Sequence, residues 1–160
     1  KQDPAVETVE AFEPEFPYSI RLASYPTLEL ALHHQSKFGE QGIEGYIVKV
    51  HLRKKGIWWR LFTGHYRDHD EAMSVMTERH LDAAEIIRTR WANLMGVFDD
   101  ETSTASVRDR VQAAGYDSYV IRDQKGRFKL FTGAFITRRG AAMQQQSLSE
   151  KGFDSKIVQR

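Results

Sequence analysis

The residues best suited to contact a ligand are aromatic and basic side chains that alternate along one predicted strand. Trp58, Arg60 and Phe62 occupy every second position, and alternate residues of a strand point to the same face of a sheet. Basic residues of the neighbouring predicted strands extend this surface. Aromatic and basic side chains on one surface are suited to binding rather than to catalysis. The candidate site residues are Arg21, Ser24, Lys49, Trp58, Arg60 and Phe62.

No combination of residues indicates a catalytic or metal site. His65 and His69 have the spacing of two ligands on one helical turn, but His65 falls at the end of a predicted strand and no third ligand is fixed nearby. Asp99, Asp100 and Glu101 directly precede a predicted helix, where acidic side chains cap the helix and complement its dipole. The sequence has no Ser-His-Asp set, phosphate loop or zinc motif, and no cysteine. We therefore expect no enzyme, no cofactor and no metal.

A tetrapeptide that occurs twice indicates a tandem repeat. Leu-Phe-Thr-Gly stands at 61–64 and again at 130–133, and the flanking segments match at an offset of 73 residues before it and 69 after it. The first copy therefore carries four extra residues, in a charged predicted hairpin. The chain divides into an acidic, proline-containing linker at 1–17, a first repeat at 18–89 and a second repeat at 90–160. The linker composition suggests that the sequence is part of a longer protein.

The same order of predicted elements appears in both repeats. In the first, apolar alternation predicts strands at 18–23, 46–51, 57–63 and 85–88, with helices at 27–42 and 69–80. The second has strands at 91–97, 119–123, 127–132 and 155–159, with one helix that starts at 102 or 104 and ends at 114 and another at 137–151. This βαββαβ order predicts an α+β fold of two ferredoxin-like modules, each a four-stranded antiparallel sheet with two helices on one face. We expect the other face to be free. Repeats of this size bury modest cores, so they are also expected to pack on each other or on a parent protein.

Strand parity predicts which side chains reach the free face. If Ile20 and Leu61 point toward the helices, Arg21, Arg60 and Phe62 point away from them. Lys49 joins the outward set only if its alternating neighbours face the helices; these are Tyr46, Val48 and Val50. A possible second site, on the matching surface of the second repeat, comprises Arg127, Lys129 and Phe131.

The motifs in this order resemble the SPOR domains of bacterial cell-division and sporulation proteins. Residues 21–25, Arg-Leu-Ala-Ser-Tyr, resemble the family's first-strand signature, Gln-x-Gly-Ser-Phe, and residues 59–66 resemble its aromatic-Arg-Val strand that runs into Gly-Pro-Phe. Residues 94–98 and 128–135 stand in the same places in the second repeat. The resemblance covers residues 18–160.

The resemblance implies binding to peptidoglycan, and in particular to glycan strands without stem peptides, across the free sheet face. A sugar chain offers apolar ring faces and hydroxyls, and the lactyl carboxylate on every second sugar would attract Arg or Lys. It also implies a periplasmic or envelope location, at the division septum, within a larger membrane-anchored or exported bacterial protein. Other division or envelope proteins are possible partners. No apolar segment is long enough to cross a bilayer, so no membrane contact is expected from this sequence.

Two other functions are compatible with the predicted fold. Paired RNA-recognition modules share this strand order and place aromatic residues on the same sheet face. The net charge of +1 argues against a nucleic-acid partner. The tandem would otherwise serve as a scaffold for protein–protein contacts.

Overall fold

The computed structural model describes residues 14–160, so most of the predicted linker lies outside the described residues. The first repeat contains β1 (Tyr18–Tyr25), α2 (Leu28–Glu40), β2 (Tyr46–Leu52), β3 (Gly56–Tyr66), α3 (His69–Glu78) and β4 (Glu85–Arg88). The second contains β5 (Trp91–Phe98), α4 (Glu101–Ala113), β6 (Ser118–Arg122), β7 (Phe128–Phe135), α5 (Arg138–Glu150) and β8 (Lys156–Gln159). The order βαββαβ is confirmed in both. None of the helices within 14–160 has the length and hydrophobicity needed to span a bilayer.

Each helix begins where a short polar side chain caps it. Thr27 accepts a hydrogen bond from the backbone N–H of Leu30 at 3.2 Å, and Asp68 accepts one from that of Glu71 at 2.8 Å. In the second repeat Asp100 and Thr137 cap α4 and α5 in the same way. The capping role predicted for the acidic run before α4 is therefore confirmed at Asp100.

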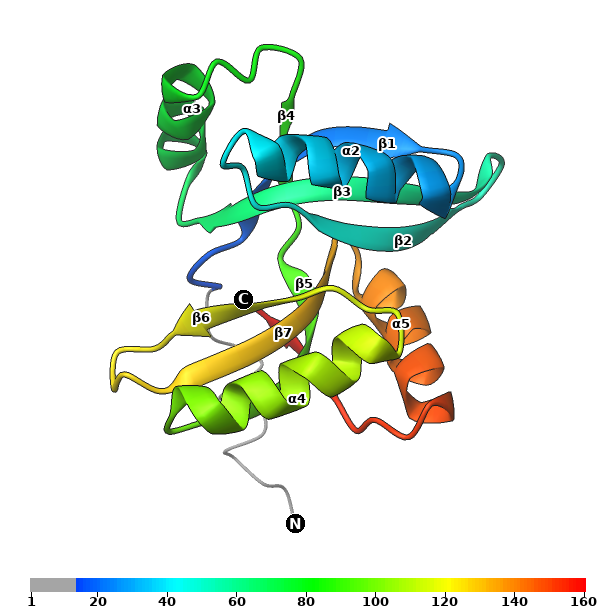
Figure 1. Cartoon of the computed structure of the whole chain (residues 1–160), viewed down its shortest axis with the longest axis vertical. Coiled ribbons are helices and arrows are strands. Elements are labelled where there is room, and N and C mark those ends of the chain that lie inside the picture. Colours follow the sequence, from blue (N-terminus) through cyan, green and yellow to red (C-terminus); the bar gives the residue numbers. More distant parts are fainter. Residues whose placement is uncertain (1–13) are drawn as a thin grey trace.

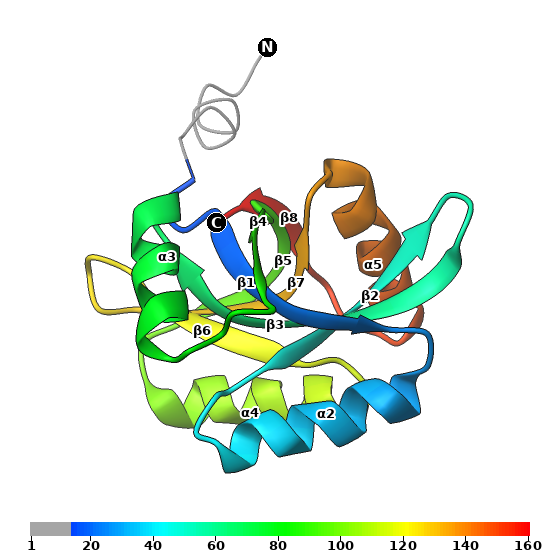
Figure 2. The ribbon, with the colours of Figure 1, turned by 90° about the horizontal axis from the view of Figure 1, so that it is seen from above.

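Each repeat forms a four-stranded antiparallel sheet with helices on one face. The strand orders are β2-β3-β1-β4 and β6-β7-β5-β8, which are equivalent. In the first repeat the helix-facing core includes Ile20, Leu61, Ala72 and Leu81. Figure 1 shows the two repeats one above the other, and Figure 2 shows α2 and α4 along one side with α3 and α5 at opposite ends. An approximate two-fold axis thus relates the repeats, and the predicted α+β fold is confirmed.

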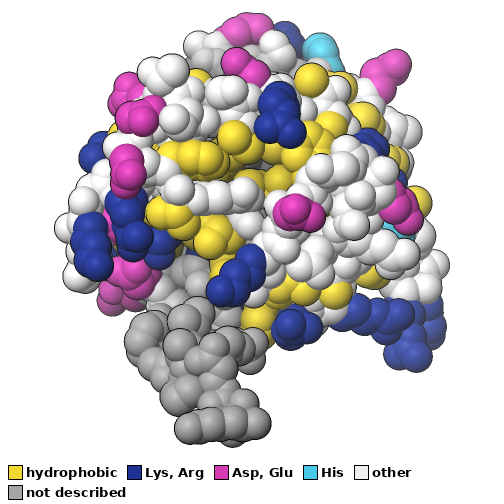
Figure 3. All heavy atoms as spheres, turned by 90° about the horizontal axis from the view of Figure 1, so that it is seen from below, with side chains coloured by type: hydrophobic (Ala, Val, Ile, Leu, Met, Phe, Trp, Pro, Cys, Tyr) yellow, Lys and Arg dark blue, Asp and Glu magenta, His cyan; other side chains and the backbone are white. Residues whose placement is uncertain are grey.

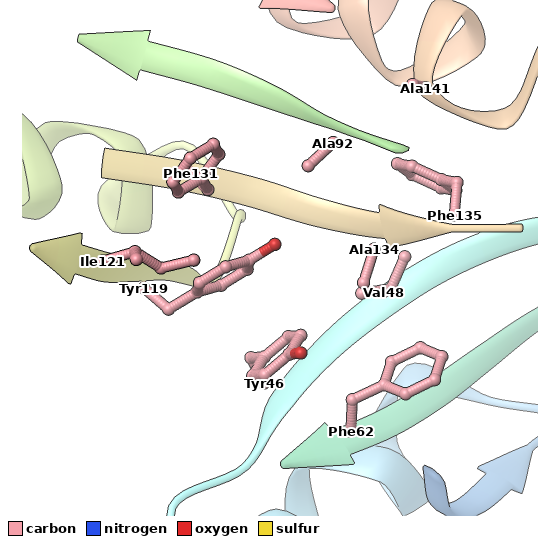
Figure 4. Packing of buried hydrophobic residues seen from close by; sticks show 10 residues of the cluster. All are labelled: Tyr46, Val48, Phe62, Ala92, Tyr119, Ile121, Phe131, Ala134, Phe135 and Ala141. Carbon is pink, nitrogen blue, oxygen red and sulfur yellow. The ribbon is translucent and has the colours of Figure 1, made fainter. Parts of the chain in front are cut away.

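The sheet faces that were predicted to be free pack against each other. One core combines Tyr46, Val48 and Phe62 of the first repeat with Tyr119 and Phe131 of the second (Figure 4). The exposed fraction is 0% for Phe62, 1% for Val48 and 4% for Phe131. The prediction of a free face is therefore wrong for the centre of both sheets. Removing these apolar faces from water stabilises two repeats whose separate cores are small.

The register of β2 explains why parity gave the wrong face for part of this strand. Tyr46 pairs with Phe62 and Val48 pairs with Arg60, so these residues share the face that packs on the second repeat. Lys49 pairs with Trp59 and belongs to the opposite face. The assumption that Tyr46 and its alternating neighbours face the helices is thus wrong. These large apolar side chains are the ones that the inter-repeat core requires.

Two tyrosines lie at the centre of the contact between the repeats. The rings of Tyr46 and Tyr119 are 4.6 Å apart between centroids. Each hydroxyl donates to a glycine carbonyl of its own repeat, Tyr46 to Gly64 at 2.8 Å and Tyr119 to Gly133 at 2.6 Å. Both glycines have positive φ values, 73° and 84°, which side chains other than glycine adopt with strain. The hydroxyl groups are therefore satisfied although the rings are buried.

A buried arginine also joins the repeats. Arg160 is 3% exposed, and its Nε donates to the carbonyl of Thr89 at 3.0 Å. Its Nη2 donates to Thr89 Oγ1 at 2.6 Å and to the hydroxyl of Ser19. The guanidinium lies over the ring of Tyr119, 5.3 Å from its centroid. Arg160 therefore holds the end of the second repeat on the first strand of the first.

His65 lies at one edge of the same interface. Its ring stacks on Tyr119 at 6.2 Å and meets the ring of Phe16 edge-on at 5.3 Å. Burial, and then the positive charge of Arg160, lower the pKa of His65 to about 4. His65 is therefore neutral at pH 7.

Candidate ligand-binding surface

The two phenylalanines predicted to contact a ligand do not reach the surface. Phe62 and Phe131 are buried between the sheets, with exposed fractions of 0% and 4%. The ring centroids of Phe62 and Tyr46 are 5.9 Å apart, and those of Phe131 and Tyr119 are 5.8 Å apart. Because Tyr46 and Tyr119 also contact each other, the four rings form a series across the contact between the repeats. Both residues therefore stabilise the tandem rather than offering a face to a ligand.

Arg60 is partly buried and has no acidic partner among residues 14–160. It pairs with Ser24 on one side and Val48 on the other, so it extends the sheet face beyond the buried centre. Within residues 14–160 the ion pairs are Arg21–Glu85 and Arg127–Asp123, and Arg60 takes part in neither. Burial, and then the nearby charge of Arg21, lower the pKa of Arg60. A partly desolvated, unpaired guanidinium is a favourable site for an anion.

The other predicted residues of the first repeat surround Arg60 unevenly. Ser24 lies on the same face, because a bulge between Arg21 and Ala23 shifts the register of β1. Trp58 is only partly buried, and its Nε1 donates to the carbonyl of Lys55 at 3.0 Å, which fixes the indole against the hairpin. Arg21 is held by Glu85, with 2.5 Å between Nη2 and Oε1. Arg60 therefore offers positive charge that Arg21 does not.

On the equivalent surface of the second repeat, one of the two cations is neutralised by an acid of the same repeat. Arg127 Nε lies 2.8 Å from Asp123 Oδ2, and the backbone N–H of Arg127 also donates to that carboxylate. Lys129 occupies the place of Arg60, paired with Val97 and Ile121. Among residues 14–160, Arg127 is thus paired with an acid, whereas Lys129, like Arg60, takes part in no ion pair.

A groove runs beside Arg60, between the two repeats. Its volume is about 380 Å³, and its walls come from β2 and β3 of the first repeat and from β7 and α5 of the second. The basic lining residues are Lys49, Arg53 and Arg60, with His51 beside them. Figure 3 shows Lys and Arg side chains gathered at the edge of the molecule where the β2–β3 hairpin projects. Of the predicted site residues, the groove brings Lys49 and Arg60 together.

Sequence reasoning missed the side of the groove that the second repeat provides. Thr137, Gly140, Met143 and Gln144 line it from the start of α5. They are about 90 residues away from β2 in the chain, and no local pattern connects them with it. These residues could have been found only by recognising that the two sheet faces pack against each other.

Within residues 14–160 no three His, Asp or Glu side chains converge as metal ligands. The fold is a tandem of two small α+β repeats that share one core. The model of the family described as SPOR domain matches residues 14–82, and the first repeat is therefore a SPOR domain. Searches among curated proteins and among solved structures returned no match. SPOR domains are peptidoglycan-binding modules of division and envelope proteins and are in general not catalytic.

Proposed function

We propose that this tandem binds peptidoglycan by recognising glycan strands that lack stem peptides, and that the second repeat is also of the SPOR type. The SPOR match of the first repeat carries the proposal. The equal strand order of the two sheets supports its extension to the second repeat. The tandem would bring its parent protein to the division septum, where amidases expose such strands.

The proposed contacts centre on Arg60, with Ser24 and Trp58 on the same sheet face. Lys49 belongs to the other face of β2 but also lines the groove beside Arg60. An unpaired guanidinium matches the lactyl carboxylate that remains on a sugar after its stem peptide is removed. The partly exposed indole of Trp58 offers an apolar face to a sugar ring. Phe62 is left out of the proposed site because it is fully buried.

The test is co-sedimentation with purified sacculi, either untreated or treated with an amidase. We expect the tandem to pellet with treated sacculi and much less with untreated ones. Arg60→Ala should raise the apparent Kd about tenfold or more, because a charge-assisted hydrogen bond contributes about 1.5–3 kcal/mol. Equal retention on both kinds of sacculi would contradict recognition of bare glycan.

Arg127→Ala is the matched control for Arg60→Ala. Both changes remove one arginine from equivalent sheet surfaces, but Arg127 is already paired with Asp123. We expect this control to change the apparent Kd less than about twofold. A loss as large as that of Arg60→Ala would indicate a second site around Arg127 and Lys129.

Single-stranded RNA is the competing ligand in the same assay. RNA-recognition modules stack bases on aromatic residues at the centre of the sheet. Here the central rings, Phe62 and Phe131, are covered by the opposite repeat. We therefore expect no RNA binding, and tight RNA binding at physiological salt would reject the glycan proposal.

A further inference from the structure

The groove between the repeats has a one-sided charge distribution. Three of its lining residues are Lys or Arg, and none is Asp or Glu. Its apolar wall includes Val50, Ile136 and Met143, and its volume of about 380 Å³ falls within the range of small-ligand sites. Cations, apolar surface and polar side chains in one groove match a saccharide that carries carboxylates.

The opposite side of the molecule shows that this charge distribution is not a consequence of the fold alone. The two-fold relation between the repeats places Asp68 where the groove has Thr137, and Glu71 where it has Gly140. Arg67, at the place of Ile136, lies over the ring of Phe16, with 5.3 Å between Cζ and the ring centroid. The equivalent of the groove thus carries acids beside Lys129, together with a ring of the chain itself.

The groove is continuous with the surface proposed to bind glycan, because Arg60 belongs to both. We propose that the glycan strand lies in this groove, so that α5 of the second repeat forms one wall of the site of the first repeat. The proposal rests on the glycan-binding function stated above and adds that a single repeat holds only part of the site. Met143 of α5, which is 41% exposed, faces the bound glycan from the side of the second repeat.

The test introduces charge at Met143. Met143→Glu places a carboxylate opposite Lys49 and Arg60 and should raise the apparent Kd for amidase-treated sacculi about fivefold or more. Met143→Lys, which alters the side chain to a similar extent but adds a cation, should bind at least as tightly as the wild type. Met73→Glu on α3 is the control, since Met73 is 44% exposed and lies outside the groove. Its apparent Kd should stay within about twofold of the wild-type value.

The outcomes separate the groove from the function. If Met143→Glu binds like the wild type while Arg60→Ala loses binding, the groove proposal is overturned and the glycan-binding function stands. If Met143→Glu and Met143→Lys weaken binding equally, the effect is not electrostatic and the proposal is also overturned. If the wild type itself ignores amidase-treated sacculi, both proposals fail. The thermal unfolding midpoint of each variant is measured as well, and a midpoint equal to that of the wild type verifies that its fold is intact.

Discussion

Phe62→Ala is the most informative perturbation of the contact between the repeats. The side chain is 0% exposed and belongs to the core that both sheets share. Truncating a buried phenylalanine to alanine costs about 3–5 kcal/mol, since it removes apolar contacts and leaves a cavity. Losing the aromatic pair with Tyr46, 5.9 Å away, places the expected loss in the upper half of this range. For a domain stabilised by about 5–15 kcal/mol the decrease is large.

The effect of Phe62→Ala should extend to the second repeat, because its rings pack in the same core. Tryptophan fluorescence can follow each repeat separately, as Trp58 and Trp59 lie in the first and Trp91 in the second. Guanidinium denaturation of variants that keep only one set of tryptophans should give coincident transitions, both shifted by Phe62→Ala.

Ile57→Ala is the control, because Ile57 is 40% exposed on the hairpin. It should cost less than about 1 kcal/mol. A shift of the unfolding transition seen only by the tryptophans of the first repeat would refute a shared core. A loss of unfolding free energy from Phe62→Ala no larger than that from Ile57→Ala would refute it as well.

Two further predictions concern buried groups at the same interface. Between pH 6.5 and about 4 the unfolded chain protonates His65 and the folded protein does not, so stability should fall by up to about 3 kcal/mol as the pH is lowered through this window. His65→Ala, which copies Ala134 of the second repeat, should remove that part of the pH dependence; parallel stability curves for both proteins would show that His65 titrates normally. Arg160→Ala should lower the free energy of unfolding by about 2 kcal/mol in urea, because Ser19 and Thr89 lose their buried donor, and an unchanged midpoint would show that Arg160 does not join the repeats.

Local structure was largely predictable from the sequence because it depends on local chemistry. The strand at 85–88 was predicted with the bounds that the structure shows, and the helix opened by Thr27 begins one residue after that cap. The duplicated tetrapeptide predicted that one topology occurs twice, as the two sheets confirm. These features follow from periodicity and capping, which act within a few residues.

The docking of the two sheets was not predicted in its detail, although β2 carried a signal for it. Ile47 pairs with Leu61 on the helix side, while Tyr46 and Val48 are apolar on the other side. A strand that is apolar on both faces is typical of a sheet covered on both faces. Strand parity shows which side chains share a face but not which face packs on the helices. Lys49 was therefore assigned to the wrong side of the sheet. The groove required the relative placement of the repeats, which no local pattern specifies.

Titration of the isotopically labelled tandem with a stem-peptide-free glycan oligosaccharide, followed by NMR, tests the proposed site most directly. We expect chemical-shift changes both in β3 around Arg60 and at the start of α5 around Gly140 and Met143. Changes confined to either repeat alone, or located away from the groove, would contradict a site that the two repeats build together.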